Sequence, residues 1–250
     1  VKYFTSSINK PPIVLEIPGR TYPVDIKWLP ECEQFAATTM WRSNNHNNAG
    51  NDPTEKSSGP TLSPRAKDKI NDTFIRALIV QIVRQQQSDG QLSTKKEGCY
   101  RQTGAILVFL PGRGEIESLA GCLKYDDKST LDCEICTILK LHSAIPKNEQ
   151  QKVFRPALEG TVKIVLATNI AETSLTISDV THVIDACRVK ESRYNASTRI
   201  RELVTVWTSQ ASLKQRAGRA GRTSAGVCWR LCSEDFCREE LLSQTAPEML

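Results

Sequence analysis

Short, uninterrupted apolar runs alternate with segments of helical periodicity over the second half of the chain. The runs lie at residues 105–110, 136–141, 162–167, 182–186, 203–207 and 227–231. Their length suits strands that are buried on both faces. Between them, apolar residues recur at helical spacing in 116–123 and 146–158. Strands that alternate with helices predict an α/β fold, with a mostly parallel central sheet and right-handed crossovers.

The first half of the chain contains one clear helix between two polar stretches. A helix is predicted for 67–84, because a large apolar residue recurs every four residues from Ile70 to Ile82. The segment 42–65 is rich in Asn, Ser and Pro, and 85–104 is rich in Gln, Ser, Gly and Lys. Such compositions bury too little apolar surface to offset the entropy lost on ordering. We therefore expect two disordered surface insertions there.

Size and composition restrict the class of protein. The 250 residues allow one large domain or two small ones, and a formal charge of +5 permits but does not show polyanion binding. No apolar run is long enough for a membrane-spanning helix, and the first ten residues lack the apolar core of a signal peptide. Nine scattered cysteines favour reduced thiols in the cytoplasm or nucleus. The lone CxxC at 133–136 has no second pair, which disfavours zinc, and we predict no metal site.

The most informative segment reads QRAGRAGR and runs from Gln215 to Arg222. If a helix begins after Ser209, then Gln215, Arg219 and Arg222 share one of its faces. Guanidinium groups match phosphate oxygens in a fork geometry. The two glycines would let another lobe or a polyphosphate come close, at a cost of about 1 kcal/mol each inside a helix. A phosphate-binding face explains that cost better than a solvated basic helix does.

A second polar motif, LATNIAETSLTI at 166–177, follows a predicted buried strand. Ligands of parallel sheets bind beyond the carboxyl ends of the strands, which is where this motif begins. Its hydroxyl and amide groups suit phosphate and ribose oxygens. By itself the motif is a weak signal, because many loops of this kind contain Thr and Asn.

Together these motifs resemble the second RecA-like lobe of DEAH-box/RHA-type RNA helicases of superfamily 2. Matching segments are 18–24 (PGRTYPV), 107–117 (LVFLPGRGEIE, motif IV), 141–146 (LHSAIP), 167–177 (motif V) and 215–222 (motif VI). The resemblance covers nearly the whole chain apart from the two insertions. It implies a single RecA-like lobe of the P-loop NTPase type, with a β-hairpin in addition to the sheet.

The resemblance also implies a domain arrangement. Residues 1–11 would be the tail of a preceding RecA lobe, and residues 12–240 would form the second lobe. That lobe would carry the flexible insertions 42–65 and 85–104. Residues 241–250 would begin the linker to a winged-helix domain.

The resemblance assigns catalytic roles to three residues. Gln215 would position the hydrolytic water, and Arg219 and Arg222 would reach the phosphates of ATP as arginine fingers. Such fingers increase the rate by about 10³–10⁵ in comparable NTPases.

Three further residues are implied to bind the nucleotide, namely Phe154, Thr176 and Asp179. Phe154 matches an aromatic side chain that stacks on adenine, although a core position is the simpler alternative because its neighbour Val153 is also apolar. Ser178 stands where many relatives have Asp, so the ribose contact in this loop departs from the family pattern.

The resemblance places RNA contacts on residues that bind sugar and phosphate without reading sequence. They are Gly112, Arg113, Ser143, Thr168, Asn169 and Lys190. Lys190 belongs to the segment 188–201, which has five basic residues and one acidic residue and matches a β-hairpin of the family. A solvated basic hairpin is an equal alternative for that segment.

The implied activity is that of an ATP-dependent RNA helicase that uses ATP and Mg²⁺ on single-stranded or partly duplex RNA. The sequence contains neither GxxxxGK[ST] nor DExH, so we expect the phosphate loop and the Mg²⁺ ligands on a first lobe outside this chain. This chain alone should therefore be inactive. The expected location is cytoplasmic or nuclear, without a membrane partner. Three alternatives stay open: a remodeller of RNA–protein complexes that does not unwind, a DNA-acting ATPase, and a non-enzymatic RNA-binding relic.

Overall fold

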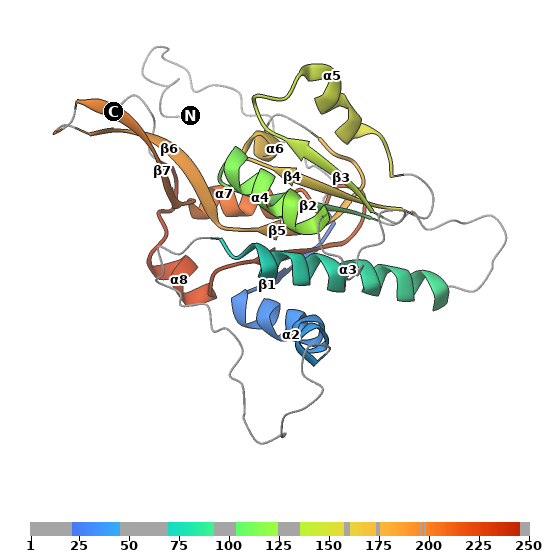
Figure 1. The fold of residues 1–250 in the computed structure, drawn as a ribbon. Coiled ribbons are helices and arrows are strands. Elements are labelled where there is room, and N and C mark those ends of the chain that lie inside the picture. Colours follow the sequence, from blue (N-terminus) through green and yellow to red (C-terminus); the bar gives the residue numbers. More distant parts are fainter. Residues whose placement is uncertain are drawn as a thin grey trace, which may run out of the picture.

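A parallel sheet of six strands forms the centre of the protein in the computed structural model (Figure 1). The structure describes residues 22–45, 70–92, 104–124, 136–157, 161–173, 176–195, 197 and 199–245. The strands are β1 (Val24–Lys27), β2 (Ala105–Phe109), β3 (Cys136–Leu141), β4 (Val162–Ala167), β5 (Val180–Asp185) and β8 (Gly226–Arg230). They lie in the order β1-β8-β5-β2-β4-β3, and every neighbouring pair is parallel. The predicted α/β fold is confirmed.

Helices cover both faces of the sheet, as the alternating strand residues require. Side chains of α2 (Leu29–Asn45), α3 (Asp72–Leu92) and α4 (Arg113–Lys124) fill a core on one face. On the other face, η1 (Gln151–Phe154), α6 (Ile170–Thr173) and α7 (Gln210–Ala217) pack over a second core. The remaining helices are α5 (Lys147–Gln150) and α8 (Glu234–Glu239). Among the described helices, none has the length and apolarity needed to cross a bilayer.

An antiparallel hairpin projects from the sheet beyond the end of β5 (Figure 1). It consists of β6 (Arg188–Asn195) and β7 (Ile200–Trp207). The prediction of 203–207 as a central strand was therefore wrong, since this run lies in the exposed hairpin. The sixth strand of the sheet is β1, whose four residues are too few to give a sequence signal.

Helix boundaries also differ from the prediction. Helix α2 was not predicted, and α3 covers Asp72–Leu92 rather than 67–84. The predicted disorder was therefore wrong for 42–45 and 85–92, which are helical. Gln is a good helix former, and Gln86 Nε2 donates to the carbonyl oxygen of Gly104 at 3.2 Å. Residues 46–65 and 93–103 of the predicted insertions, the predicted tail 1–11, Cys133 and residues 246–250 lie outside the described residues.

Helix α7 begins where the sequence predicted and ends earlier. Ser209 caps it, because its Oγ accepts a hydrogen bond from Ser212 N at 3.3 Å. The helix ends at Ala217 and turns follow to residue 221, so Arg219 and Arg222 do not continue a helical face with Gln215. The predicted shared face was wrong. The chain leaves the helix here because it must return to the sheet at β8.

The two glycines of this segment have different roles, and substitutions would separate them. A Cβ at Gly221 would lie 2.6 Å from the carbonyl oxygen of Tyr22 and 2.7 Å from Cγ2 of Val24. At Gly218, the backbone is helical and a Cβ would lie 3.4 Å from its nearest neighbour. We therefore expect Gly221→Ala to destabilise the lobe by about 1–3 kcal/mol. Gly218→Ala, the matched control, should be neutral or stabilising by up to about 1 kcal/mol. Urea unfolding measures both, and equal effects would contradict this view of Gly221.

The stability of the lobe should decrease below neutral pH because of His182. Burial lowers the pKa of His182 to about 4, and its Nδ1 accepts from Trp229 Nε1 at 3.5 Å. The unfolded chain binds this proton near pH 6.5, so stability is lost as the pH falls from 6.5 toward 4, by up to about 3 kcal/mol. Urea unfolding at pH 7 and pH 5 measures the change. A His182→Gln variant should show a smaller loss, and an identical pH dependence would rule out His182 as the cause.

Candidate nucleotide and RNA interface

Residues predicted to contact RNA gather at the carboxyl edge of the sheet. Gly112 and Arg113 follow β2, Ser143 follows β3, and Thr168 and Asn169 follow β4. Thr168 N donates to the carbonyl oxygen of Leu141 at 3.1 Å, which ties the ends of β3 and β4 together. Arg113, Ser143 and Asn169 are exposed, Thr168 is half-buried and Gly112 is buried. This edge therefore offers a row of polar groups on three adjacent strand ends.

Residues predicted to contact the nucleotide lie at the opposite, amino edge. Thr176 and Asp179 precede β5, and Arg222 precedes β8. Arg222 Nη1 donates a hydrogen bond to Thr176 Oγ1, so the structure brings these two predicted residues together. We expected ligand-binding residues beyond the carboxyl ends of the strands. In the structure the predicted RNA-binding residues lie there, and the predicted nucleotide-binding residues do not. The polar motif begins at the carboxyl edge, continues through α6 and ends at the amino edge.

Phe154 is exposed, whereas its neighbour Val153 is buried. The Phe154 side chain is 37% exposed at the end of η1, while Val153 is 0% exposed and packs in the core. The alternative that Phe154 is a core residue was therefore wrong. An exposed ring at this position is free to meet a flat ligand.

Asp179 takes part in a buried ion pair. Its Oδ1 lies 2.8 Å from Lys163 Nζ, and the side chains are 13% and 3% exposed. Its second oxygen, Oδ2, is buried and accepts no hydrogen bond from a described residue. Lys163 was missed in the sequence, although a single lysine within the apolar run VKIVLA was a usable signal.

The two predicted arginine fingers are close enough to affect each other electrostatically. Arg219 is buried, and its Nη2 donates to the carbonyl oxygen of Glu172. Burial and, after it, the positive charge of Arg222 lower the pKa of Arg219. Two nearby guanidinium groups favour an anion beside them. Gln215, the third catalytic candidate, is exposed on α7.

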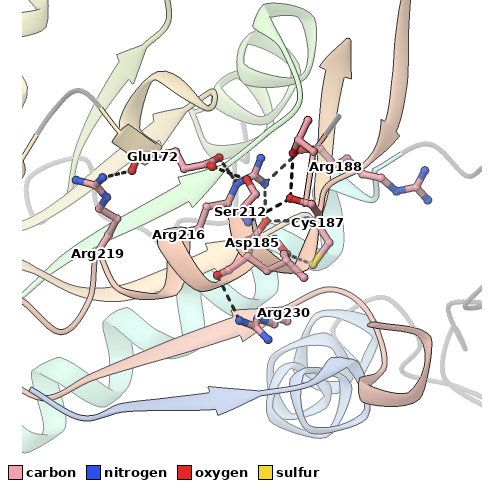
Figure 2. Close-up of polar contacts among 11 residues, drawn as sticks. Glu172, Asp185, Cys187, Arg188, Ser212, Arg216, Arg219 and Arg230 are labelled. Atoms are coloured by element: carbon pink, nitrogen blue, oxygen red, sulfur yellow. Dashed lines mark hydrogen bonds and ion pairs between the residues drawn. The ribbon is translucent and has the colours of Figure 1, made fainter. Parts of the chain in front are cut away.

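A buried network around Arg216 connects this region to the hairpin (Figure 2). Arg216 Nε lies 3.0 Å from Glu172 Oε2, and Nη1 lies 2.9 Å from Asp185 Oδ1. Nη1 also donates to the carbonyl oxygen of Arg188 at 3.3 Å, and Ser212 Oγ donates to Glu172 Oε1. Burial opposes the charge of Arg216, but the carboxylates of Asp185 and Glu172 outweigh it and raise its pKa. One cation thus joins α6, α7, β5 and the start of β6.

Sequence reasoning missed this network. Arg216 lies within motif VI and Glu172 within motif V, but only the fold shows that they meet. Asp185 ends the run DVTHVID, where an acidic residue after apolar positions was the available signal.

Lys190 holds the hairpin against α4. Its Nζ lies 2.9 Å from Glu115 Oε2, and both side chains are about three-quarters buried. A Cβ at Gly112 would lie 2.7 Å from Lys190 Nζ and 2.8 Å from its Cδ. The missing side chain of Gly112 therefore leaves room for Lys190. In this arrangement the predicted RNA-binding lysine also fixes the hairpin to the carboxyl edge.

The described side chains fit a nucleotide but form no cluster for a resident metal. Arg219, Arg222 and the Thr176 hydroxyl suit phosphate and ribose oxygens, and Phe154 offers an aromatic face. Within the described ranges, no group of three or more His, Cys, Asp or Glu side chains could hold a metal ion.

Comparisons with known proteins show the family to which this chain belongs. Residues 91–224 match the helicase conserved C-terminal domain. The Mycosarcoma maydis protein UM11114, named as a DEAH-box ATP-dependent helicase, is 34% identical over 98% of this chain and 16% of its own length. The Arabidopsis thaliana DExH-box ATP-dependent RNA helicase DExH2 is 50% identical over 52% of this chain and 8% of its own.

A solved structure extends the similarity to three dimensions. The Escherichia coli DExH-box NTPase HrpB superposes with a TM-score of 0.64 at 29% identity, covering 93% of this chain and 22% of HrpB. The chain thus spans between a twelfth and a quarter of the length of these relatives. The chain therefore belongs to the helicase conserved C-terminal domain family, as a RecA-like lobe similar to those of DEAH-box and DExH-box helicases.

Proposed function

We propose that the full-length protein is an ATP-dependent RNA helicase and that this lobe forms one wall of both the ATP site and the RNA path. One observation carries the proposal. Predicted nucleotide residues lie at the amino edge of the sheet and predicted RNA residues at the carboxyl edge, and one polar motif has Thr168 at the carboxyl edge and Thr176 at the amino edge. Such an arrangement suits a protein in which ATP and RNA each affect the binding of the other.

At the amino edge, this chain would contact the side of the nucleotide that faces away from the preceding RecA lobe. The Phe154 ring would stack on the base, and the Thr176 hydroxyl would meet the ribose. Arg219 and Arg222 would neutralise charge on the phosphates in the transition state, and Gln215 would orient the attacking water. Bound Mg²⁺·ATP supplies the phosphoryl group that is transferred to water. The phosphate loop and the Mg²⁺ ligands would come from a preceding RecA lobe.

At the carboxyl edge, Ser143, Thr168 and Asn169 would hydrogen-bond to the sugar–phosphate backbone, and Arg113 would add a positive charge. Groups of these types fix the register of RNA without reading its sequence. Lys190 would contribute from the base of the hairpin, which it also anchors to α4. A winged-helix domain would follow this lobe in the full-length chain.

The experiment that tests the proposal compares ATP hydrolysis by the full-length protein with and without single-stranded RNA. Displacement of labelled strands from RNA and DNA duplexes is measured in parallel. Hydrolysis that RNA stimulates, together with displacement from RNA duplexes, would support the proposal. Hydrolysis without displacement would favour a remodeller of RNA–protein complexes, and stimulation by DNA alone would favour a DNA-acting ATPase. RNA binding without hydrolysis would favour a non-enzymatic relic.

A further inference from the structure

Lys163 carries a charge in the middle of an apolar strand. It is the second residue of β4, all six of whose residues are buried, and its side chain is only 3% exposed. Burying an ammonium group is costly unless its hydrogen bonds are satisfied, and an apolar side chain of similar size is often at least as stable. The position of this lysine therefore calls for a reason other than stability.

All three N–H donors of the Lys163 ammonium group have acceptors, and each acceptor adjoins the proposed nucleotide site. Nζ donates to the carbonyl oxygen of Val153 at 2.9 Å and to that of Arg155 at 2.8 Å. These carbonyls belong to the residues on either side of Phe154. The third donor goes to Asp179 Oδ1 at 2.8 Å, in the loop that also carries Thr176.

In the segment that carries Phe154, helices α5 and η1 bury one side chain, that of Val153. Helices α5 and η1 are four residues each, and neither has a side-chain cap at its N-terminus. After η1, the backbone becomes extended at Arg155, whose N–H donates to the carbonyl of Lys152 at a long 3.3 Å. Lys163 thus holds the backbone on both sides of an exposed ring.

We propose that Lys163 is a positioning residue that fixes the Phe154 ring and the 176–179 loop as one surface for the adenine ring. It does not touch the nucleotide itself. The proposal rests on the proposed stacking of Phe154 on the base. Fixing the ring before ATP binds removes an ordering cost from the binding step.

The test measures KM for ATP and the inhibition constant of inorganic tripolyphosphate in RNA-stimulated hydrolysis by the full-length protein. Lys163→Met should raise KM for ATP about fivefold, the low end of the effect of losing one stacked base. The inhibition constant of tripolyphosphate should not change, because this competitor has no base. Partial unfolding would lower kcat instead, since it reduces the amount of active enzyme.

A matched control is Lys140→Met on the neighbouring strand β3. Lys140 pairs with Glu117, as Lys163 pairs with Asp179, but Glu117 lies on α4, which covers the face of the sheet opposite to η1. This variant should leave both constants unchanged. If Lys163→Met folds poorly, Lys163→Gln keeps an amide donor for one carbonyl and should raise KM by a smaller factor.

A double-mutant cycle with Phe154→Ala separates the inference from the proposed function. If Lys163 acts through the ring, Lys163→Met should raise KM no further once Phe154 is Ala. An equal rise in both backgrounds, or a parallel change in the tripolyphosphate constant, would overturn the role of Lys163. If Phe154→Ala alone leaves KM unchanged, base stacking itself fails, and the proposed platform fails with it.

Discussion

Replacing Arg222 with Ala should reduce RNA-stimulated ATP hydrolysis by the full-length protein about 10³-fold or more. The Arg222 guanidinium donates to Thr176 at the amino edge, beside the Arg219 charge that its own charge repels. Phosphate oxygens between the two guanidinium groups would offset that repulsion. The stabilisation would be largest in the transition state, where negative charge develops on the phosphate oxygens. RNA affinity should change little, because the predicted RNA residues lie at the opposite edge.

A suitable control for this substitution is Arg238→Ala. Arg238 lies exposed on α8 and pairs with Glu234 one turn earlier, and surface pairs of this kind contribute little, so its loss should leave turnover unchanged. Steady-state hydrolysis and equilibrium binding of a labelled single-stranded RNA provide the two measurements. Near-normal turnover in Arg222→Ala would refute the assignment of Arg222 as a finger. An equally large loss of RNA affinity would refute the separation of the two edges.

How far the sequence predicts the fold depends on how many residues each element contains. The runs at 136–141 and 162–167 are six residues long and predicted β3 and β4 at their observed bounds. Strand β1 has four residues, and its place at the sheet edge follows from pairing with β8, which is distant in sequence. The run 203–207 looks like a buried strand, but it pairs antiparallel with β6. The place of each of these strands depends on the strand with which it pairs. The periodicity of apolar residues along the chain carries no information about that partner.

For the site, the structure adds the arrangement of residues that the sequence names one by one. Thr176 and Arg222 were both assigned to the nucleotide, and they meet. The helical face expected from the spacing of Gln215 and Arg222 does not exist, because α7 ends at Ala217 so that the chain can reach β8. Lys163 and Asp185 matter because of the ion pairs they form with Asp179 and Arg216. These partners are distant in the sequence, so no local pattern reveals them.

Replacing Arg216 with Met should destabilise the lobe by about 3–5 kcal/mol, the usual cost of leaving buried charges without a partner. Without the guanidinium, Glu172 and Asp185 lose their shared cation, and Asp185 is fully buried. A loss of this size is a large part of the total stability of a domain, about 5–15 kcal/mol. Urea unfolding of the lobe measures it. Lys214→Met, at an exposed position of the same helix, is the matched control and should have little effect.

A double variant shows whether unpaired charge is the cause. Adding Asp185→Asn to Arg216→Met removes one of the two charges left unpaired, so the double variant should be less destabilised than the sum of the single changes. Simple additivity would mean that Arg216 contributes through packing, including its position 5.1 Å from the ring centre of Phe109. A buried ion network is seldom more stable than an apolar core of the same volume. The network instead positions structural elements, because the Arg216 side chain holds α6, α7, β5 and the start of the hairpin relative to one another (Figure 2).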